Sequence, residues 1–302
     1  MSGNAAVSPH TNPPANPPVA LSIAGTDPSG GAGIHADLKT FTALGAYGTT
    51  VITALVAQNT HGVQRVYGID EDFVRDQFSS VAGDMHIDAT KTGMLGTRGL
   101  VDLVCHEIES RDLGFLTVDP VMVSTSGHRL LDADAVDAVR SRLVPLAGLI
   151  TPNLPEAALL LGDDVPEATS PARMRAQARE LVARGARSVL LKGGHLDSGE
   201  LVDVLVHGEP GSPDSAEVRE FMSPRIDTAN THGTGCTLSA GVTARTAAGV
   251  PLTRAVEQAR DYLERAIASA ADWQLARDPE GAHGPVDHLV DIRPEVERWV
   301  RS

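Results

Sequence analysis

Lysine is rare in this 302-residue chain, which has only three copies, Lys39, Lys91 and Lys192. Arginine carries the rest of the positive charge, so the places where lysine occurs are informative. The two cysteines, Cys105 and Cys236, are too few to indicate a disulfide framework or a zinc site. We therefore expect reduced thiols in a cytoplasmic protein.

Long apolar runs are also missing, and no stretch approaches the roughly 20 residues that a membrane span needs. The formal net charge of −14 argues against a sequence-independent grip on nucleic acid. Any anionic substrate must then be held by local hydrogen-bond donors. The first 18 residues contain paired prolines but no lysine, arginine or apolar segment, which differs from a signal peptide and predicts a disordered leader.

From residue 19 onward, short apolar runs alternate with segments of helical spacing. Val19–Ala24 is an apolar run, a glycine-rich loop follows it, and Ile34–Leu44 has apolar residues at helical intervals. The recurrence of this pattern predicts one α/β domain over 19–273, with a mainly parallel sheet covered by helices on both faces. We expect residues 274–302 to pack on the same domain. Strands are expected at 19–24, 49–57, 66–69, from 89, and at 115–118, 148–150, 188–191, 201–206 and 217–222, and helices at 34–44, 70–81, 97–109, 157–161, 171–184, from 237 and from 251.

Two glycines, Gly233 and Gly235, stand just before small residues that favour a helix beginning at about Thr237. A helix N-terminus has N–H groups without intrahelical partners and a positive dipole end, so this loop can hold a phosphate close to its backbone. A plain tight connection explains the glycines alone equally well. Cys236 follows the loop directly and is the candidate nucleophile or base, because the same N–H groups can lower the pKa of a thiol. The alternative is a small residue tolerated in a crowded place.

The other glycine-rich loop, Gly25–Gly33, has neither the Lys-Ser/Thr pair of a P-loop nor the spacing of a dinucleotide fingerprint. We assign it to substrate contact or a tight turn. Polar residues also stand at the carboxyl ends of predicted strands, where open parallel sheets bind ligands. Alternatives stay open there, namely solvated turns or lysines and ordinary helix capping. These residues are Gln58, Asp119, Asn153, Glu156 and Lys192.

Eight segments, in order, resemble the bacterial hydroxymethylpyrimidine/phosphomethylpyrimidine kinases of thiamine biosynthesis, which belong to the ribokinase superfamily. No single segment is specific, but the series is, and it covers Val19 to Trp273. The resemblance implies a ribokinase-like three-layer α/β/α fold in a single domain. It also implies ATP-dependent phosphorylation of 4-amino-5-hydroxymethyl-2-methylpyrimidine to its monophosphate and then its diphosphate, with Mg²⁺ as cofactor. The segments are Ala24–Ile34, Ala36–Thr40, Val51–Thr60, Lys91–Leu95, Asp119–Met122, Thr151–Ala157, Leu191–His195 and Asn230–Thr237.

On the nucleotide side, the resemblance implies that backbone N–H groups hold the ATP phosphates and stabilise the charge that develops on the transferred group. Asp119 and Glu156 are the implied metal-binding residues, since a small set of oxygen ligands suits Mg²⁺. Catalysis is assigned to Cys236, Lys192 and the anion hole, which is the backbone of Gly233 to Gly235. The implied ATP-binding residues are Asp119, Asn153, Glu156, Lys192, Gly233, Thr234 and Gly235.

On the substrate side, the matching residues are Ala32, Asp37, Gln58, Met94 and Val121. Gln58 offers both a donor and an acceptor to an aminopyrimidine edge, while Met94 and Val121 give apolar contact. Met94 as a core residue and Asp37 as a helix N-terminal carboxylate remain alternatives.

Two positions bear on substrate preference. His35 stands where these kinases often have Gln, and most sugar kinases have Asp where Cys236 stands, a cysteine shared with some pyridoxal kinases. The nearest rival function is a pyridoxal kinase, whose substrate is a similar heteroaromatic hydroxymethyl compound, and Gln58 and Met94 favour the pyrimidine. A ligand-binding protein without catalysis fits less well, because it has no need of Lys192, Glu156 and Cys236. A Rossmann oxidoreductase also fits less well, because the sequence lacks the glycine fingerprint of that class. The oligomeric state stays open, a homodimer among the options.

Overall fold

The computed structural model describes residues 16–122, 131–194, 200–208, 211 and 215–292. The leader up to residue 15, the end of the Leu191–His195 segment and the last ten residues lie outside this part. No helix within the described ranges is long and apolar enough to span a membrane.

An eight-stranded sheet in the order β10-β9-β8-β7-β6-β5-β1-β2 forms the middle layer. The six strands from β2 to β8 in this order are parallel, and β9 and β10 continue the sheet as antiparallel neighbours. These pairings confirm the expected mainly parallel sheet. Three strands also have the bounds expected from sequence. The strands are β1 (Val19–Ala24), β2 (Tyr47–Ile52), β5 (Ala89–Thr92), β6 (Phe115–Val118), β7 (Leu149–Ile150), β8 (Ser188–Leu191), β9 (Glu200–His207) and β10 (Glu217–Pro224).

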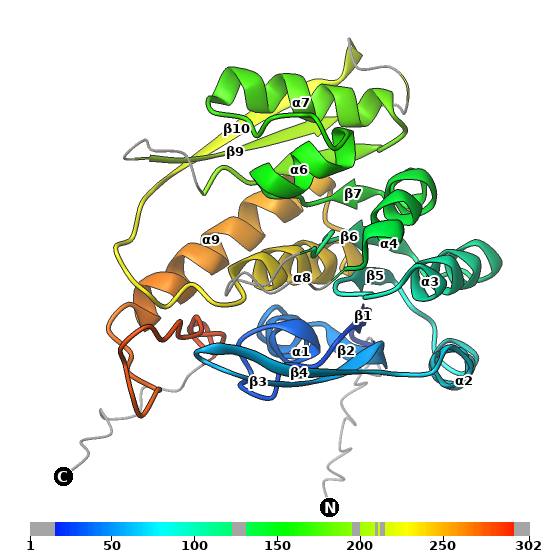
Figure 1. Ribbon diagram of the computed structural model, residues 1–302, viewed down its shortest axis with the longest axis horizontal. Helices are drawn as coiled ribbons and strands as arrows, with labels where there is room; N and C mark the ends of the chain where they lie inside the picture. The colour runs from blue at the N-terminus through cyan, green and yellow to red at the C-terminus, as the bar shows by residue number, and fades with distance from the viewer. Residues whose placement is uncertain (1–15, 123–130, 195–199, 209–210, 212–214, 293–302) are drawn as a thin grey trace, which may run out of the picture.

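Helices cover both faces of this sheet, so the three-layer α/β/α architecture is confirmed (Figure 1). One face carries α1 (Gly33–Ala43), α8 (Thr234–Ala247) and α9 (Leu252–Ala270), whose buried side chains form two of the apolar clusters. The helices of the other face contribute to the third and largest cluster. They are α2 (Glu71–Ala82), α3 (Arg98–Ser110), α4 (Ala133–Ala138), a π-helical turn (Val139–Leu143), α5 (Val144–Leu146), α6 (Leu154–Leu161) and α7 (Pro171–Ala183).

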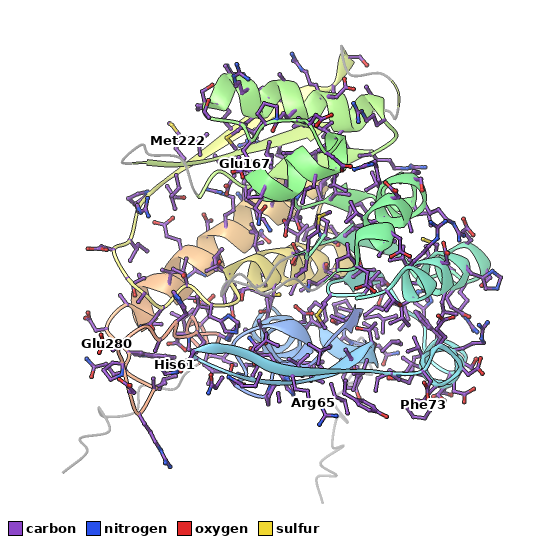
Figure 2. The ribbon with its side chains drawn as sticks, in the orientation of Figure 1. His61, Arg65, Phe73, Glu167, Met222 and Glu280 are labelled. Carbon is purple, nitrogen blue, oxygen red and sulfur yellow. The ribbon has the colours of Figure 1, made fainter. Side chains whose placement is uncertain are left out.

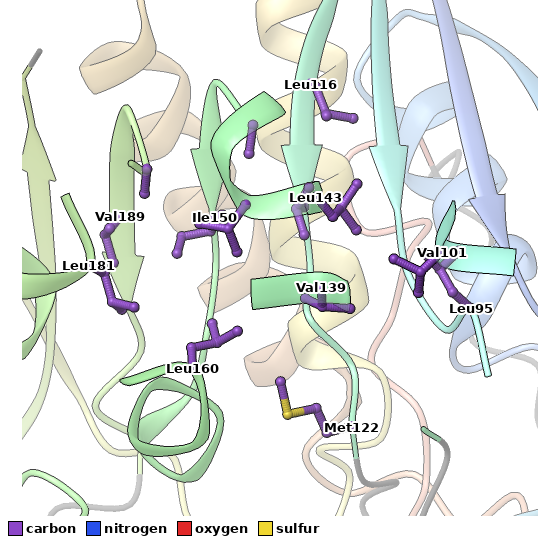
Figure 3. Close-up of a cluster of buried hydrophobic side chains, with 14 of the residues drawn as sticks. Leu95, Val101, Leu116, Met122, Val139, Leu143, Ile150, Leu160, Leu181 and Val189 are labelled. Carbon is purple, nitrogen blue, oxygen red and sulfur yellow. The ribbon is translucent and has the colours of Figure 1, made fainter. Parts of the chain in front are cut away.

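The largest cluster joins side chains from distant parts of the chain, as Figure 3 shows for Val101 of α3, Leu160 of α6 and Val189 of β8. Each fully buried aliphatic side chain of this kind contributes about 1.5–3 kcal/mol to folding. The run from α4 to α5 in this layer was not expected from sequence. The packing fixes the ends of the parallel strands, and the polar residues described below follow these ends.

The expected strand at 49–57 is wrong in one respect, because the run is divided into β2 and a second strand, β3 (Ala54–Asn59). Thr53 separates them: its N–H donates to Ala24 O at 3.1 Å and its Oγ1 to Met94 O at 2.7 Å. β3 then pairs antiparallel with β4 (Gly62–Gly68) in a separate two-stranded ribbon. This β3–β4 ribbon runs along the lower edge of the molecule in Figure 1.

The chain after α9 returns to the domain. His288 accepts a hydrogen bond on its backbone oxygen from Tyr262 at 2.7 Å, and its Nε2 lies 3.0 Å from Thr237 Oγ1 in α8. The N–H of His283 donates to Thr60 O at the tip of the β3–β4 ribbon, at 2.8 Å. This segment therefore contacts both the ribbon and the helical layer.

Candidate active site

Asp119 and Lys192, at the ends of β6 and β8, form an ion pair with 3.2 Å between Oδ1 and Nζ. Thr151 donates to Oδ1 at 3.1 Å and Ser239 of α8 donates to Oδ2 at 3.2 Å. Burial alone would raise the pKa of the Asp119 carboxyl, but Lys192, Lys91 and the hydrogen bond from Thr151 hold it below its usual range. Asp119 is thus an ionised, firmly oriented carboxylate.

Asn153 and Glu156 begin α6 with a reciprocal capping box. Asn153 N donates to Glu156 Oε2 and Glu156 N donates to Asn153 Oδ1, both at 2.8 Å. Both residues therefore cap the helix, as one of the two alternatives from the sequence predicted. Burial, then the nearby Asp119 carboxylate, raises the pKa of Glu156 to about 7 against the attraction of Lys192. Capping and a second role are compatible, because Glu156 is a buried carboxyl whose ionisation burial opposes and the nearby Lys192 favours.

The N-terminus of α8 lies beside this pair. The helix begins at Thr234, three residues earlier than expected, and Gly233 precedes it with φ +80°. A Cβ at Gly233 would come within 1.7 Å of Gly31 O, so only glycine fits where the two glycine-rich loops meet. A Cβ at Gly235 would lie 3.2 Å from Lys192 Nζ, which places the lysine at the helix terminus. N–H groups and an ammonium group therefore gather at one point.

Cys236, in the first turn of α8, does not have the lowered pKa that its position suggested. Burial, reinforced by the Asp37 and Asp119 carboxylates, raises the pKa of its thiol to about 11, although Lys91 and a backbone hydrogen bond from Gly33 act the other way. Helix N–H groups alone do not decide the ionisation of this thiol. In the ligand-free protein Cys236 is a neutral thiol at neutral pH.

Asp37 and Lys91 form an ion pair beneath the site, with 2.9 Å between Oδ2 and Nζ and no exposed surface on either side chain. Ser22 of β1 donates to the same Oδ2 at 2.6 Å, whereas Oδ1 of Asp37 has no hydrogen-bond partner. Burial opposes the charge of Lys91, but Asp37, Cys236 and Asp119 together hold the pKa of Lys91 above its usual range. Burial raises the pKa of the Asp37 carboxyl, while the ammonium group of Lys91 and the hydroxyl of Ser22 favour its ionised form. With Lys91 charged and both groups donating to Oδ2, the pair is an ammonium group facing a carboxylate.

A second buried pair, Asp27 with His232, is a feature that the sequence analysis missed. His232 Nε2 lies 2.7 Å from Asp27 Oδ2 and 3.1 Å from the side-chain amide of Gln58. The two members of the pair are 205 positions apart. Only their places in two separate glycine-rich motifs hinted at a contact.

Of the other residues expected on the substrate side, Ala32 and Met94 contact the loop after β1, whereas Val121 follows β6 beside Asp119. Ala32 N donates to Asp27 Oδ2 at 2.8 Å, and Val121 N to Asp119 O at 2.8 Å. Met94 packs so closely on Gly25 that a Cβ there would lie 2.5 Å from its terminal methyl carbon. The structure thus brings the expected residues together in one group around Lys192, which Val121 adjoins through Asp119, and another group around this loop. The contact of Gly233 with Gly31 joins the two groups.

Comparison with known proteins places this arrangement among kinases. A family model described as phosphomethylpyrimidine kinase matches residues 27–287. The chain is 49% identical over 270 residues to the hydroxymethylpyrimidine/phosphomethylpyrimidine kinase of Escherichia coli (strain K12), covering 89% of this chain and 97% of that one. The corresponding enzyme of Streptomyces coelicolor is 43% identical over 276 residues, covering 91% and 96%.

Two solved structures share the fold. The phosphomethylpyrimidine kinase of Clostridium difficile 630 has a TM-score of 0.71 at 37% identity, covering 82% of this chain and 99% of that one. An ADP complex of Bacillus subtilis pyridoxal kinase has a TM-score of 0.77 at 39% identity, covering 90% and 97%. The ribokinase-like fold expected from the resemblance is therefore confirmed.

Proposed function

This chain belongs to the phosphomethylpyrimidine kinase family and phosphorylates hydroxymethylpyrimidine and its phosphate in thiamine biosynthesis, and we propose that it does so where Asp119, Lys192 and the α8 N-terminus meet. It is an ATP-dependent kinase. The observation that carries the location is the approach of Lys192 to the first turn of α8, because an ammonium group and the N–H groups of a helix N-terminus together suit phosphate.

The ATP phosphates lie, in this proposal, on the backbone of Gly233, Thr234 and Gly235. Phosphoryl transfer demands positioning and charge stabilisation more than covalent chemistry, and fixed N–H donors supply both. Lys192 neutralises charge on the same phosphates. Its ion pair with Asp119 supports this role, since it holds the ammonium group in place before any ligand binds.

Asp119 and Glu156 would hold Mg²⁺, with Asn153 orienting Glu156 and contacting the waters of the ion. No group of three or more His, Cys, Asp or Glu side chains is arranged to hold a metal within the described ranges. That suits Mg²⁺, which proteins bind through one or two carboxylates together with phosphates and waters. The raised pKa of Glu156 fits too, because a bound cation would favour the ionised form that burial, and then the charge of Asp119, disfavour. The ion would neutralise charge on the transferred phosphoryl group.

Cys236 lies beside the attacking hydroxyl in this proposal, and the pyrimidine occupies the loop after β1. Ala32, Gln58, Met94 and Val121 line the ring. Asp37 belongs to the same side. Its buried Oδ1 has no hydrogen-bond partner, which supports this placement because the oxygen can still accept a hydrogen bond. Because the thiol of Cys236 is neutral without ligands, it accepts the hydroxyl proton only if ligand binding favours the thiolate.

We also propose that the protein is a homodimer in the cytoplasm. Leu55 and Tyr67 are cross-strand partners in the β3–β4 ribbon, and they are 46% and 60% exposed. Figure 2 shows Arg65 and Phe73 along the same edge of the molecule. Two-stranded sheets are marginal alone and exposed apolar clusters often mark interfaces, so this edge suits a second copy. Both cysteines are free thiols, which supports a reducing compartment.

The function is tested by incubating the purified full-length chain with ATP, Mg²⁺ and the pyrimidine alcohol while recording product masses. We expect the addition of one and then two phosphoryl groups, and loss of both products when Mg²⁺ is chelated. Absence of any phosphorylated product, or phosphorylation unaffected by chelation, would count against the proposal.

A further inference from the structure

The buried pair of Asp27 and His232 joins the substrate loop to the anion hole. The side chains are 2% and 9% exposed, and Nε2 of His232 lies 2.7 Å from Oδ2 of Asp27. The imidazole also packs against Gly31, where a Cβ would come within 2.5 Å of Cδ2. The ring is thus held by Asp27 and by its contact with Gly31, and His232 immediately precedes Gly233 in the chain.

Hydrogen bonds from the surrounding loop hold the Asp27 carboxylate. Ser29 donates to Oδ1 from its N–H at 2.9 Å and from its Oγ at 2.6 Å, and Ala32 N donates to Oδ2 at 2.8 Å. Burial alone would raise the pKa of Asp27, but His232 and Ser29 lower it to about 2. At neutral pH Asp27 is therefore ionised and can only accept hydrogen bonds. A nitrogen at 2.7 Å from it must donate, so Nε2 of His232 carries a proton.

This assignment restricts the third member of the cluster, Gln58. The amide nitrogen of Gln58 lies 3.1 Å from the same Nε2, and an Nε2 that donates to Asp27 has no lone pair left to accept from it. Two N–H groups facing each other repel. Turning the amide by 180° places Oε1 there instead, and Nε2 of His232 can then donate to both Asp27 and Gln58.

We propose that Asp27 and His232 are positioning residues that fix the Gln58 amide with its oxygen toward His232 and its NH₂ group toward the substrate. The inference rests on the proposed function in taking Gln58 as the residue that meets the heteroaromatic ring. The site then presents a hydrogen-bond donor, and it selects rings with an acceptor nitrogen at that edge. An aminopyrimidine has such a nitrogen beside its amino group.

The tautomer is tested on the wild-type holoprotein by ¹⁵N NMR of the histidine rings, with His232 assigned from a His232→Gln spectrum. We expect Nε2 of His232 to carry a proton at pH 7, with and without Mg-ATP. An unprotonated Nε2 would overturn the proposal. This measurement needs no active variant, so it stands even if the wild type does not phosphorylate the pyrimidine.

Selectivity is tested with the pyrimidine alcohol and an analogue in which CH replaces the ring nitrogen beside the amino group. We expect wild-type kcat/KM to favour the pyrimidine by about tenfold, the upper end for one neutral hydrogen bond. In His232→Ala the ratio should fall to near one, because the Gln58 amide can then turn. In Gln58→Glu it should fall as well, because a carboxylate replaces the NH₂ donor. A folded His232→Ala variant that keeps the wild-type ratio refutes the positioning role.

His86→Ala is the matched control. His86 also faces an aspartate, Asp88, at 3.3 Å, but the histidine is 76% exposed on the surface. The selectivity ratio should not change in this variant. Melting temperatures and far-UV circular dichroism identify any variant that fails to fold. If a variant does not fold, the protonation of Nε2 of His232 in the wild type decides whether the positioning role stands. No turnover by the wild type would instead reject the proposed function.

Discussion

Replacing Lys91 by Met should destabilise the protein strongly, because it leaves the Asp37 carboxylate buried and without a counter-ion. Both side chains have no exposed surface, and Oδ1 of Asp37 has no hydrogen-bond partner even in the wild type. Removing one partner of such a pair typically costs about 3–5 kcal/mol. Domains have only about 5–15 kcal/mol of stability in total. The variant therefore loses a large share of its free energy of unfolding.

Urea unfolding at pH 7, followed by circular dichroism, measures this loss. The double variant Lys91→Met with Asp37→Asn should recover most of it, since the uncompensated charge is removed. The deficit of the single variant should also shrink as the pH falls, because Asp37 can then take up a proton. Arg98→Met is the control: its pair with Asp102 spans 3.6 Å on an exposed helix surface and contributes at most about 0.5 kcal/mol. A loss below about 1 kcal/mol for Lys91→Met would refute the reasoning.

Three further outcomes follow from the site. Cys236→Ala should lower kcat about 100-fold, the low end of the range for a general base. It should change the KM for ATP only slightly, because the backbone donors remain. A variant that keeps the kcat of the wild type at saturating substrates would show that the thiol is not needed. Burial first, then Lys39, lowers the pKa of His288 to about 4 in the folded protein, from an ordinary value of 6.5. As the pH falls between these values the unfolded state takes up a proton before the folded state does, so the wild type should lose about 3 kcal/mol of unfolding free energy. His288→Gln should not show this loss, which chemical unfolding at each pH would measure. Gly233→Ala should abolish ATP binding in calorimetry, whereas Gly281→Ala, which also has positive φ but has nothing within 4 Å of the added Cβ, should bind ATP normally.

Local signals in the sequence were sufficient for the layers of the fold. Val19–Ala24, Phe115–Val118 and Ser188–Leu191 are strands with the bounds expected from their apolar, β-branched composition. The run at 49–57 was misjudged because its division depends on partners far away in the chain, Ala24 and Met94, which bond to Thr53.

The candidate site was predictable where residues follow strand ends. Asp119 and Lys192 were each expected after a strand on the nucleotide side of the site, and the structure joins the two side chains at 3.2 Å. The Asp27 and His232 pair was not predictable, since it depends on the folding of two loops 205 positions apart. The pKa of Cys236 was misjudged for the same reason: burial and two distant carboxylates outweigh the local helix terminus.

Substrate preference tests the central claim most directly, because the solved pyridoxal kinase resembles this fold as closely as the solved pyrimidine kinase does. Equal concentrations of the pyrimidine alcohol and pyridoxal are incubated in one tube with limiting Mg-ATP, and the phosphorylated products are quantified by mass. Their ratio gives the ratio of the two kcat/KM values. We predict that pyrimidine mono- and diphosphate predominate. Pyridoxal phosphate in equal or greater amount would contradict the assignment.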